Sequence, residues 1–303
     1  MSATVVALGG NALVREGEVG TVSEQRANLR RHCAALVPLL DGPLVVTHGN
    51  GPQVGAALLR SERAADEVPP LPLWLAVAQT QAEIGSLIGL ELGALAGRAV
   101  ATLVTHVRVD EDDPAFAEPT KPIGPFYARE QAQRLESERG WRLSEDAGRG
   151  WRRVVPSPQP RAVVELEAVR RLLDEGVVAV ACGGGGIPVV ARDGRLDGVD
   201  AVIDKDFASA LLATALAARR LVVLTDVPAL LRGYGTAAEE EVRSLTPDEA
   251  DDLLPELAEG SMRPKVEACA RFVRESRGEA LICSAAGLSD ALEGKSGTRI
   301  AGE

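Results

Sequence analysis

Short apolar segments alternate with longer amphipathic segments along most of the chain. The apolar segments are rich in β-branched residues and bounded by glycine or polar residues, as buried parallel strands are. They span residues 4–10, 43–49, 100–109, 176–183, 221–227 and 279–284. Helical patterns span residues 23–40, 53–65, 73–95, 162–175, 206–218, 246–257 and 261–276. This alternation predicts an α/β fold, with an open, mostly parallel central sheet and helices on both faces.

Residues 110–154 interrupt the alternation with proline-rich and charged segments. Long insertions of this kind in compact α/β proteins often form lids or binding loops. We therefore expect a small protruding, lid-like subdomain at about residues 111–153. Further along, Asp193-Gly194 lies between apolar residues and predicts a β-hairpin over residues 189–196.

The composition and charge disfavour several classes of protein. The chain has 303 residues and a formal charge of −11, which disfavours binding to nucleic acid or to an anionic membrane. Its longest uncharged run, residues 42–59, contains polar residues and is not a membrane span. The start of the chain has no basic flank that would mark a signal peptide. Four scattered cysteines indicate reduced, buried thiols, and we expect a cytoplasmic protein.

Lysine is rare in this sequence. Of the 33 basic residues only Lys121, Lys205, Lys265 and Lys295 are lysine, and the other 29 are arginine. An ammonium is a compact point charge, whereas a guanidinium is a wide planar fork. A lysine that persists against such a bias is a candidate for chemistry that needs a small cation. The alternative is that four lysines remain by chance.

Three glycine-rich turns follow predicted strands: Gly9-Gly10-Asn11, Gly49-Asn50-Gly51 and Gly183 to Gly186. Glycine lets backbone N–H groups approach an anion, and the N-terminus of the next helix adds partial positive charge. The alternative for each segment is a tight turn that only connects two elements. Two such turns after successive strands favour an anion site.

Neither of two common nucleotide-binding motifs is present. Val54 stands where a dinucleotide-binding loop requires its third glycine, and Ser289 replaces the first glycine of a P-loop that would end at Lys295. The three histidines are too dispersed for a metal cage, and no Ser–His–Asp or Cys–His arrangement is evident. Cys182 is expected to be a buried thiol, and His106 to be structural or peripheral.

The positions of three lysines indicate the kind of anion site more specifically than the glycine turns do. Lys205 lies between Asp204 and Asp206; Asp204 is a candidate helix cap, which leaves Asp206 free to orient ammonium groups. Lys265 follows a predicted cap and Pro264, where a cation opposes the helix dipole unless an anion compensates it. Lys121 lies on a proline-stiffened loop of the insertion. Together with the glycine turns, these lysines predict a site for phosphoryl transfer.

The motifs resemble the amino acid kinase family and, within it, the carbamate kinases. The resemblance extends over nearly the whole chain. The segments that carry it are VVALGGNAL (5–13), THGNGPQVG (47–55), DDPAFAEPTKPIGPFY (112–127), EDAGRGWRRVVPSP (145–158), ACGGGGIPVV (181–190), VIDKDFASALLA (202–213), LTDV (224–227), GSMRPKVEA (260–268) and GKSGT (294–298). It implies an amino acid kinase-like α/β/α sandwich.

The resemblance also implies roles for individual residues. The catalytic residues would be Lys121, Lys205, Asp206 and Lys265. Carbamate or carbamoyl phosphate would be held by Gly9, Gly10, Asn11, Gly49, Asn50 and Gly51. The nucleotide would be bound by Gly184, Asp226, Tyr234, Met262 and Pro264. Mg²⁺ would come with ATP or ADP, since the sequence offers no dedicated metal ligands.

The implied organisation has two lobes. Residues 1–178, which include the lid-like subdomain, would bind carbamate or carbamoyl phosphate, and residues 179–303 would bind the nucleotide. The implied activity is reversible phosphoryl transfer between carbamoyl phosphate plus ADP and carbamate plus ATP, in arginine catabolism, by a cytoplasmic homodimer. Two departures from the family pattern, His106 and Arg263, lie at the edge of the predicted site. The alternatives are another phosphotransferase of the family and a non-catalytic sensor of nucleotide or carbamoyl phosphate.

Overall fold

The computed structural model describes residues 3–9, 12–15, 17–145, 150–236, 239–258 and 260–302. Its centre is an eight-stranded sheet in the order β15-β17-β16-β12-β1-β2-β9-β3. The strands are β1 (Thr4–Leu8), β2 (Leu44–His48), β3 (Val100–Thr102), β9 (Val178–Val180), β12 (Arg220–Thr225), β15 (Ser244–Leu245), β16 (Glu279–Ser284) and β17 (Thr298–Ala301). All neighbours described in this sheet are parallel except the β16–β17 pair, so the predicted open, mostly parallel sheet is confirmed.

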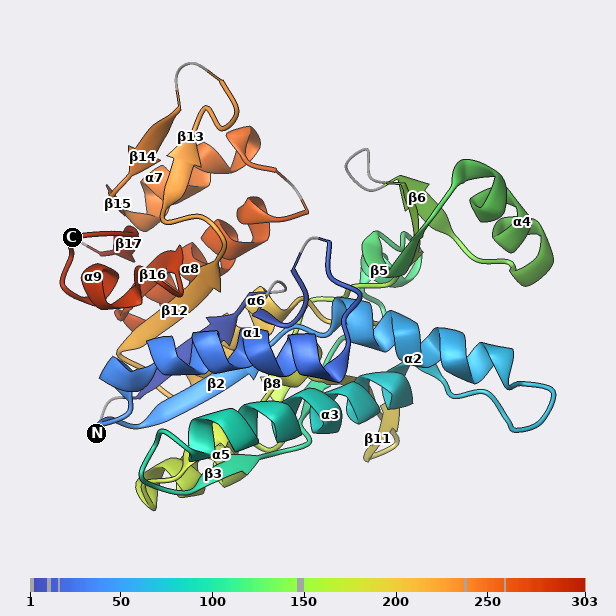
Figure 1. Ribbon diagram of the computed structural model, residues 1–303, viewed down its shortest axis with the longest axis horizontal. Coiled ribbons are helices and arrows are strands. Elements are labelled where there is room, and N and C mark those ends of the chain that lie inside the picture. The colour runs from blue at the N-terminus through green and yellow to red at the C-terminus, as the bar shows by residue number, and fades with distance from the viewer. Residues whose placement is uncertain are drawn as a thin grey trace.

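Helices cover both faces of the sheet (Figure 1). One face packs against α1 (Val22–Ala35), α3 (Leu73–Gly93) and α9 (Leu288–Leu292), and the other against α5 (Leu166–Asp174), α6 (Lys205–Ala215), α7 (Pro247–Leu253) and α8 (Met262–Ser276). In β1, Val5 and Ala7 face the second group of helices and Val6 and Leu8 face the first, because side chains alternate along a strand. Every residue of β1 is buried, as a strand covered on both faces requires.

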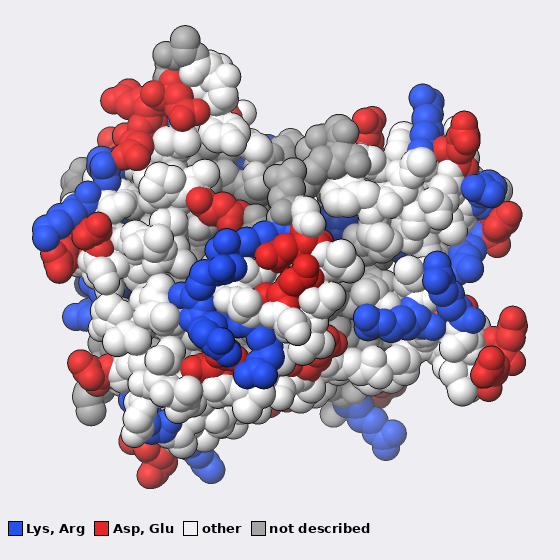
Figure 2. Space-filling model, in the orientation of Figure 1, with Lys and Arg blue, Asp and Glu red and all other residues white. Residues whose placement is uncertain are grey.

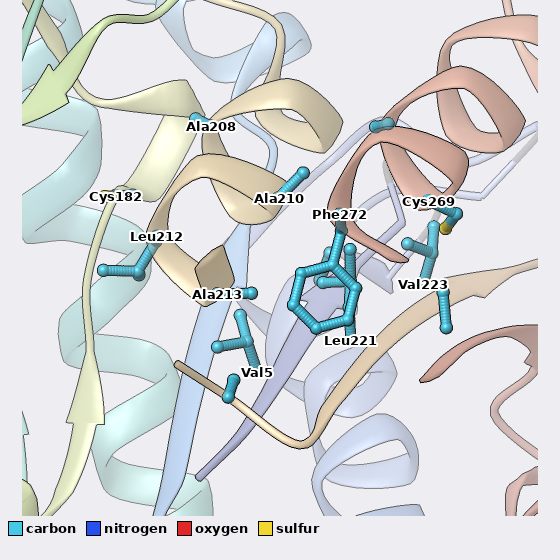
Figure 3. Close-up of a cluster of buried hydrophobic side chains, with 14 of the residues drawn as sticks. Val5, Cys182, Ala208, Ala210, Leu212, Ala213, Leu221, Val223, Cys269 and Phe272 are labelled. Atoms are coloured by element: carbon cyan, nitrogen blue, oxygen red, sulfur yellow. The ribbon is translucent and has the colours of Figure 1, made fainter. Parts of the chain in front are cut away.

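Figure 3 shows the packing on the α6–α8 face. Phe272 of α8 points toward Leu221 of β12, beside the small side chains Ala210 and Ala213 of α6. These side chains are fully or almost fully buried. The small residues let the two helices approach the sheet closely, so the helix that carries Lys205 and the helix that carries Lys265 lie side by side.

One predicted strand is wrong. Residues 100–109 form two strands in different sheets, because after β3 the chain leaves the main sheet and β4 (His106–Arg108) joins a four-stranded sheet, β11-β10-β4-β8. The buried amide of Gln81 accepts from the Thr105 N–H at 2.8 Å and donates to the Thr105 carbonyl at 3.0 Å. These two bonds satisfy the N–H and carbonyl of Thr105, where the chain passes from the main sheet to the second sheet. The apolar pattern of residues 100–109 did not indicate this change of sheet.

The second sheet also contains β8 (Ala162–Val163), β10 (Ile187–Arg192) and β11 (Arg195–Gly198). Its β10–β11 hairpin turns at Asp193 and Gly194, whose φ angles are +49° and +76°, so the predicted hairpin is confirmed. The predicted helix over residues 162–175 begins only at Leu166, because Ala162 and Val163 pair with β4 instead. Strands β13 (Leu230–Arg232) and β14 (Glu240–Val242) form a separate two-stranded ribbon that was not predicted.

The insertion forms a three-stranded sheet in the order β5-β7-β6 with one helix. Its elements are β5 (Lys121–Tyr127), α4 (Arg129–Arg139), β6 (Leu143–Glu145) and β7 (Trp151–Val155). Figure 1 shows this sheet and the β13–β14 ribbon projecting on the same side of the molecule. Short 3-10 turns lie at Val37–Leu39, Pro114–Phe116, Gly183–Gly185 and Leu254–Glu256.

Helix α2 (Gly51–Arg63) carries the inserted sheet. Gly55 of α2 and Gly124 of β5 pack backbone against backbone, since a Cβ added to Gly55 would lie 1.9 Å from the Gly124 Cα. Glu62 of α2 also pairs with Arg139 at 3.0 Å and with Arg153 at 2.9 Å. The first residue of β5, Lys121, is therefore placed by contacts made at α2.

The described helices include none that combines the length and apolar character needed to cross a membrane. Figure 2 shows positive and negative side chains interleaved across one face of the molecule. Arg26 and Arg30 of α1, for example, both pair with Glu91 of α3. The net negative charge thus coexists with local pairing of both signs.

Replacing Gly55 by alanine tests how the inserted sheet is held. We expect Gly55→Ala to lower the free energy of unfolding by roughly 3 kcal/mol, because the added methyl meets backbone atoms that have no rotamer to change. Urea denaturation measures the effect. Gly93→Ala, whose methyl would meet nothing within 4 Å, is the control and should cause no loss. Equal stabilities for the two variants would contradict the close contact.

Candidate active site

The N-terminus of α6 organises the candidate site. Asp204 is the N-cap, and its Oδ1 accepts a hydrogen bond from the backbone N–H of Asp206 at 2.8 Å, which confirms the predicted cap. The helix is tied to the end of β2 by a 2.6 Å hydrogen bond between the hydroxyls of Ser209 and Thr47. These two contacts hold the start of α6 at the carboxyl end of a central strand, where ligands of parallel sheets bind.

Asp206 brings two lysines together. Its Oδ1 accepts from Lys205 Nζ at 2.5 Å, and its Oδ2 accepts from Lys265 Nζ at 3.2 Å. Lys265 comes from the first turn of α8 and also donates to the Ser261 carbonyl at 3.0 Å. The side chains of Asp206, Lys205 and Lys265 are only 4%, 11% and 15% exposed, so water screens their charges weakly.

These contacts fix the charge of the carboxylate. Burial alone would raise the pKa of Asp206, but attraction to Lys205 and Lys265 holds that pKa well below its usual range. Burial and the nearby charge of Lys265 lower the pKa of Lys205 despite Asp206, whereas the pKa of Lys265 is raised because Asp206 outweighs its burial. Asp206 is therefore ionised at neutral pH and orients two ammonium groups.

Lys121 is the third lysine at the site. It is the first residue of strand β5, where it pairs with Val155 of β7, and so does not lie on a loop as predicted. Its Nζ forms an ion pair with Asp204 Oδ2. Asp204 and Asp206 are two residues apart at the same helix end, so the ammonium of Lys121 lies beside the other two. Lys121 also contributes to the electrostatic lowering of the Asp206 pKa. Three of the four lysines of the chain thus gather at one point.

The second glycine turn lies against these lysines. A Cβ added to Gly49 would lie 3.5 Å from Lys205 Cδ, so the lysine stem crosses this turn. Asn50 is buried, and its amide Nδ2 donates to Thr80 Oγ1 at 2.9 Å. Gly51 is the first residue of α2, so its backbone is at that helix N-terminus. Of the first turn, Gly9 lines the cleft described next, while Gly10 and Asn11 are outside the described residues.

Lys265 also lines a cleft of about 890 Å³. Three of the predicted nucleotide-binding residues line it, Asp226, Tyr234 and Met262, together with Gly9. Most of its other lining residues come from the segments that follow β12 and precede α8. The cleft thus places a space large enough for a nucleotide next to the ammonium cluster.

Two other predicted nucleotide residues are not in that lining. Pro264 lies in the first turn of α8, between Met262 and Lys265, and is not among the residues that line the cleft. Gly184 is buried against Asn50: a Cβ there would lie 2.2 Å from Asn50 Nδ2, and its φ is +63°. Gly184 therefore supports the Gly49-Asn50-Gly51 turn and is not among the residues that line the cleft.

Several other residues have structural environments. Cys182 and the other three cysteines are free and buried, as expected, and burial raises the pKa of the Cys182 thiol to about 12. His106 Nδ1 lies 2.8 Å from Glu165 Oε1, and Glu165 also accepts from the His106 backbone N–H. Lys295 is exposed and pairs with Glu293. Ser261 is at the N-cap position of α8, but its side chain makes no capping hydrogen bond.

The pairing of Asp204 with Lys121 was not predicted. The sequence identified Asp204 only as a cap, and 83 positions separate it from Lys121. The sequence signal was that a cap uses one oxygen of the Asp204 carboxylate and leaves the other for a second donor. In the described part of the chain, no three His, Cys, Asp or Glu side chains form a group that would hold a metal ion.

The chain is similar to known proteins over its whole length. The model of the amino acid kinase family matches residues 2–284. The chain is 45% identical to the carbamate kinase of Thermococcus kodakarensis over 315 aligned residues, covering all of both chains. It superposes on carbamate kinase from Giardia lamblia bound to citric acid with a TM-score of 0.94 at 37% identity, covering 100% of this chain and 99% of that one. The structure of the Giardia lamblia enzyme bound to AMP-PNP gives a TM-score of 0.91 at 38% identity with the same coverage.

His48 predicts a dependence of stability on pH. It is fully buried beside the Gly49 turn, and burial lowers its pKa from 6.5 to about 4. Between pH 6.5 and pH 4, His48 is protonated in the unfolded chain but not in the folded chain. The free energy of unfolding therefore falls as the pH drops below 6.5, until His48 of the folded chain is protonated near pH 4. We expect His48 to account for a loss of about 2 kcal/mol between pH 7 and pH 5.

Urea denaturation at the two pH values measures this loss. The variant His48→Gln has no group that titrates at this position and should lose correspondingly less stability over the same interval. It should keep a smaller dependence from His32, whose pKa burial also lowers. The same loss in both proteins would show that His48 is not the group responsible.

Proposed function

The chain belongs to the amino acid kinase family, and on this basis we propose that it is an enzyme that transfers a phosphoryl group reversibly between carbamoyl phosphate plus ADP and carbamate plus ATP. The observation that carries the proposal is the Asp206 carboxylate, which holds the ammoniums of Lys205 and Lys265 between the Gly49 turn and the cleft. Full-length similarity to proteins named carbamate kinase supports the same substrate class.

Phosphoryl transfer needs positioned reactants and neutralised charge more than covalent help from the protein. An ammonium has three N–H donors. In the described structure Lys205 and Lys121 each donate one of theirs to a carboxylate, and Lys265 donates to a carboxylate and to a carbonyl. The remaining donors are available to the oxygens of the transferring group. The acceptor oxygen of carbamate is already anionic, so the reaction requires no general base.

The substrate side of the site would be formed by the two glycine turns. Backbone N–H groups of Gly9, Gly10 and Asn11, and of Gly49, Asn50 and Gly51, would hold carbamate or carbamoyl phosphate. The N-terminus of α2, which begins at Gly51, adds partial positive charge there. Gly184 keeps Asn50 in place through the contact described above.

The nucleotide side would be the cleft lined by Asp226, Tyr234 and Met262. Its phosphates would extend toward Lys265, and Pro264 stiffens the helix turn that carries this lysine. We propose that Mg²⁺ enters with ATP or ADP and neutralises the phosphate charge. Both oxygens of Asp206 accept from lysines, so we assign this carboxylate to orienting cations of the protein.

We also propose that the chain works as a homodimer in the cytoplasm and serves ATP synthesis in arginine catabolism. Residues 1–178 would form the lobe for carbamate or carbamoyl phosphate, the inserted sheet would act as its lid, and residues 179–303 would form the nucleotide lobe. The mass of the purified protein in solution tests the dimer. Another acceptor is the main competing function, and a panel that includes acetylglutamate and aspartate distinguishes it.

The decisive experiment is ATP formation from carbamoyl phosphate and ADP with Mg²⁺, followed by a coupled assay. We expect sustained turnover. A purified protein that binds nucleotide but forms no ATP would favour the sensor alternative, and a preference for a larger carboxylate would favour a related kinase.

Replacement of lysine by arginine tests the need for compact cations. Lys205→Arg and Lys265→Arg should each lower turnover by about 100-fold or more while the protein stays folded. The wider guanidinium does not fit the space that each ammonium occupies beside Asp206, which for Lys205 is also bounded by Gly49. Lys295→Arg is the matched control, since the Lys295 side chain is exposed and its ammonium pairs with Glu293. It should change turnover by less than about twofold. Similar effects at all three positions would refute the argument.

A further inference from the structure

Asp204 has two contacts of different kinds. Its Oδ1 caps α6 by accepting from the Asp206 backbone N–H at 2.8 Å. Its Oδ2 accepts from Lys121 Nζ. The carboxylate is buried, with 12% of the side chain exposed, whereas 33% of the Lys121 side chain is exposed. The capping bond therefore fixes the direction of the second oxygen, and the flexible partner in this ion pair is Lys121.

Lys121 needs a partner to fix the position of its ammonium, because it comes from the inserted sheet. It is the first residue of β5, in the inserted sheet, and that sheet is attached to the rest of the protein mainly at α2 through Gly55, Gly124 and Glu62. Nothing in that attachment sets the rotamers of a long lysine side chain, which carries about 2 kcal/mol of rotamer entropy. The pair with Asp204 fixes where the ammonium is.

We propose that Asp204 is a positioning residue, which holds the ammonium of Lys121 beside Lys205 and Lys265 before the anionic substrate arrives. The proposal rests on the proposed function, because it assigns Lys121 to carbamoyl phosphate. Asp204 touches neither substrate nor reacting atoms in this scheme and acts through Lys121.

Lys121 has enough N–H donors to bind Asp204 and an anionic substrate at the same time. Lys121 donates one N–H to Asp204 and keeps two, so an incoming anion binds it without breaking the ion pair. The three ammoniums and the two carboxylates, Asp204 and Asp206, carry a net charge of +1 at the positive end of α6. The cluster thus attracts an anion even while every carboxylate is paired.

Two substitutions separate the roles of Asp204. Asn and Ser are both good N-caps, so Asp204→Asn and Asp204→Ser keep the bond to the Asp206 N–H. Neither supplies the second acceptor for Lys121, because the other group of an asparagine is an NH₂ donor and serine has one oxygen. We expect either variant to raise the KM for carbamoyl phosphate by about tenfold and to leave the KM for ADP within about twofold of wild type.

A cycle with Lys121→Met distinguishes positioning from a structural effect of the cap. In the Lys121→Met background, Asp204→Asn should change kcat/KM for carbamoyl phosphate by less than about twofold, because the residue through which it acts is gone. A structural effect on α6 would disturb Lys205 in either background. A cost that is the same in both backgrounds, or an unchanged KM in the single variant, overturns the proposal.

A second readout does not depend on turnover. The chain has only four lysines, so ¹³Cε labelling of lysine gives four side-chain signals that single substitutions assign. In the wild type the ¹³Cε relaxation of Lys121 should report an ordered side chain, and in Asp204→Asn it should become as mobile as exposed Lys295. If Lys121 is equally mobile in both proteins, the positioning proposal fails, whatever group the enzyme transfers. If there is no turnover but Lys121 is ordered in the wild type and mobile in Asp204→Asn, the proposed function fails and the positioning by Asp204 stands.

Discussion

The site depends on one buried carboxylate that is shared by two ammoniums. The ammoniums of Lys205 and Lys265 lie against the same carboxylate and repel each other, and both are too buried for water to screen that repulsion effectively. Asp206 between them lowers the energy of the pair and fixes both nitrogens, one from α6 and one from α8. Removing Asp206 would leave two buried ammoniums without a compensating charge, so both lysines depend on this carboxylate.

The fold provides the conditions for this unit. Small side chains on α6 let α8 pack beside it, with Phe272 against the sheet (Figure 3). The Ser209–Thr47 bond holds α6 to the end of β2, next to the Gly49 turn. As a result the ammoniums lie between a turn built of backbone N–H donors and a cleft large enough for a nucleotide. That arrangement suits the proposed in-line transfer of a phosphoryl group, in which carbamoyl phosphate would bind at the turn and the nucleotide in the cleft.

The inserted sheet adds a third cation by a separate route. It is anchored at α2 by a glycine–glycine contact and by Glu62, and it reaches the start of α6 through the Lys121–Asp204 pair. The two attachments differ in kind: the first is steric and admits little change, while the second is an ion pair between side chains. The inserted sheet is thus fixed sterically at its base and joined to the start of α6 by an ion pair between side chains.

The order of strands and helices, the hairpin at Asp193 and the Asp204 cap could be predicted from the sequence, because strand alternation, turn chemistry and capping are local properties. The division of residues 100–109 between two sheets could not, since it involves hydrogen bonds between Gln81 of α3 and the Thr105 backbone, far apart along the chain. The lysines were conspicuous by their rarity, but only the tertiary structure decided their partners. Lys265 meets Asp206 across 59 positions and Lys121 meets Asp204 across 83, and such pairings follow from how the elements pack and not from any pattern along the chain.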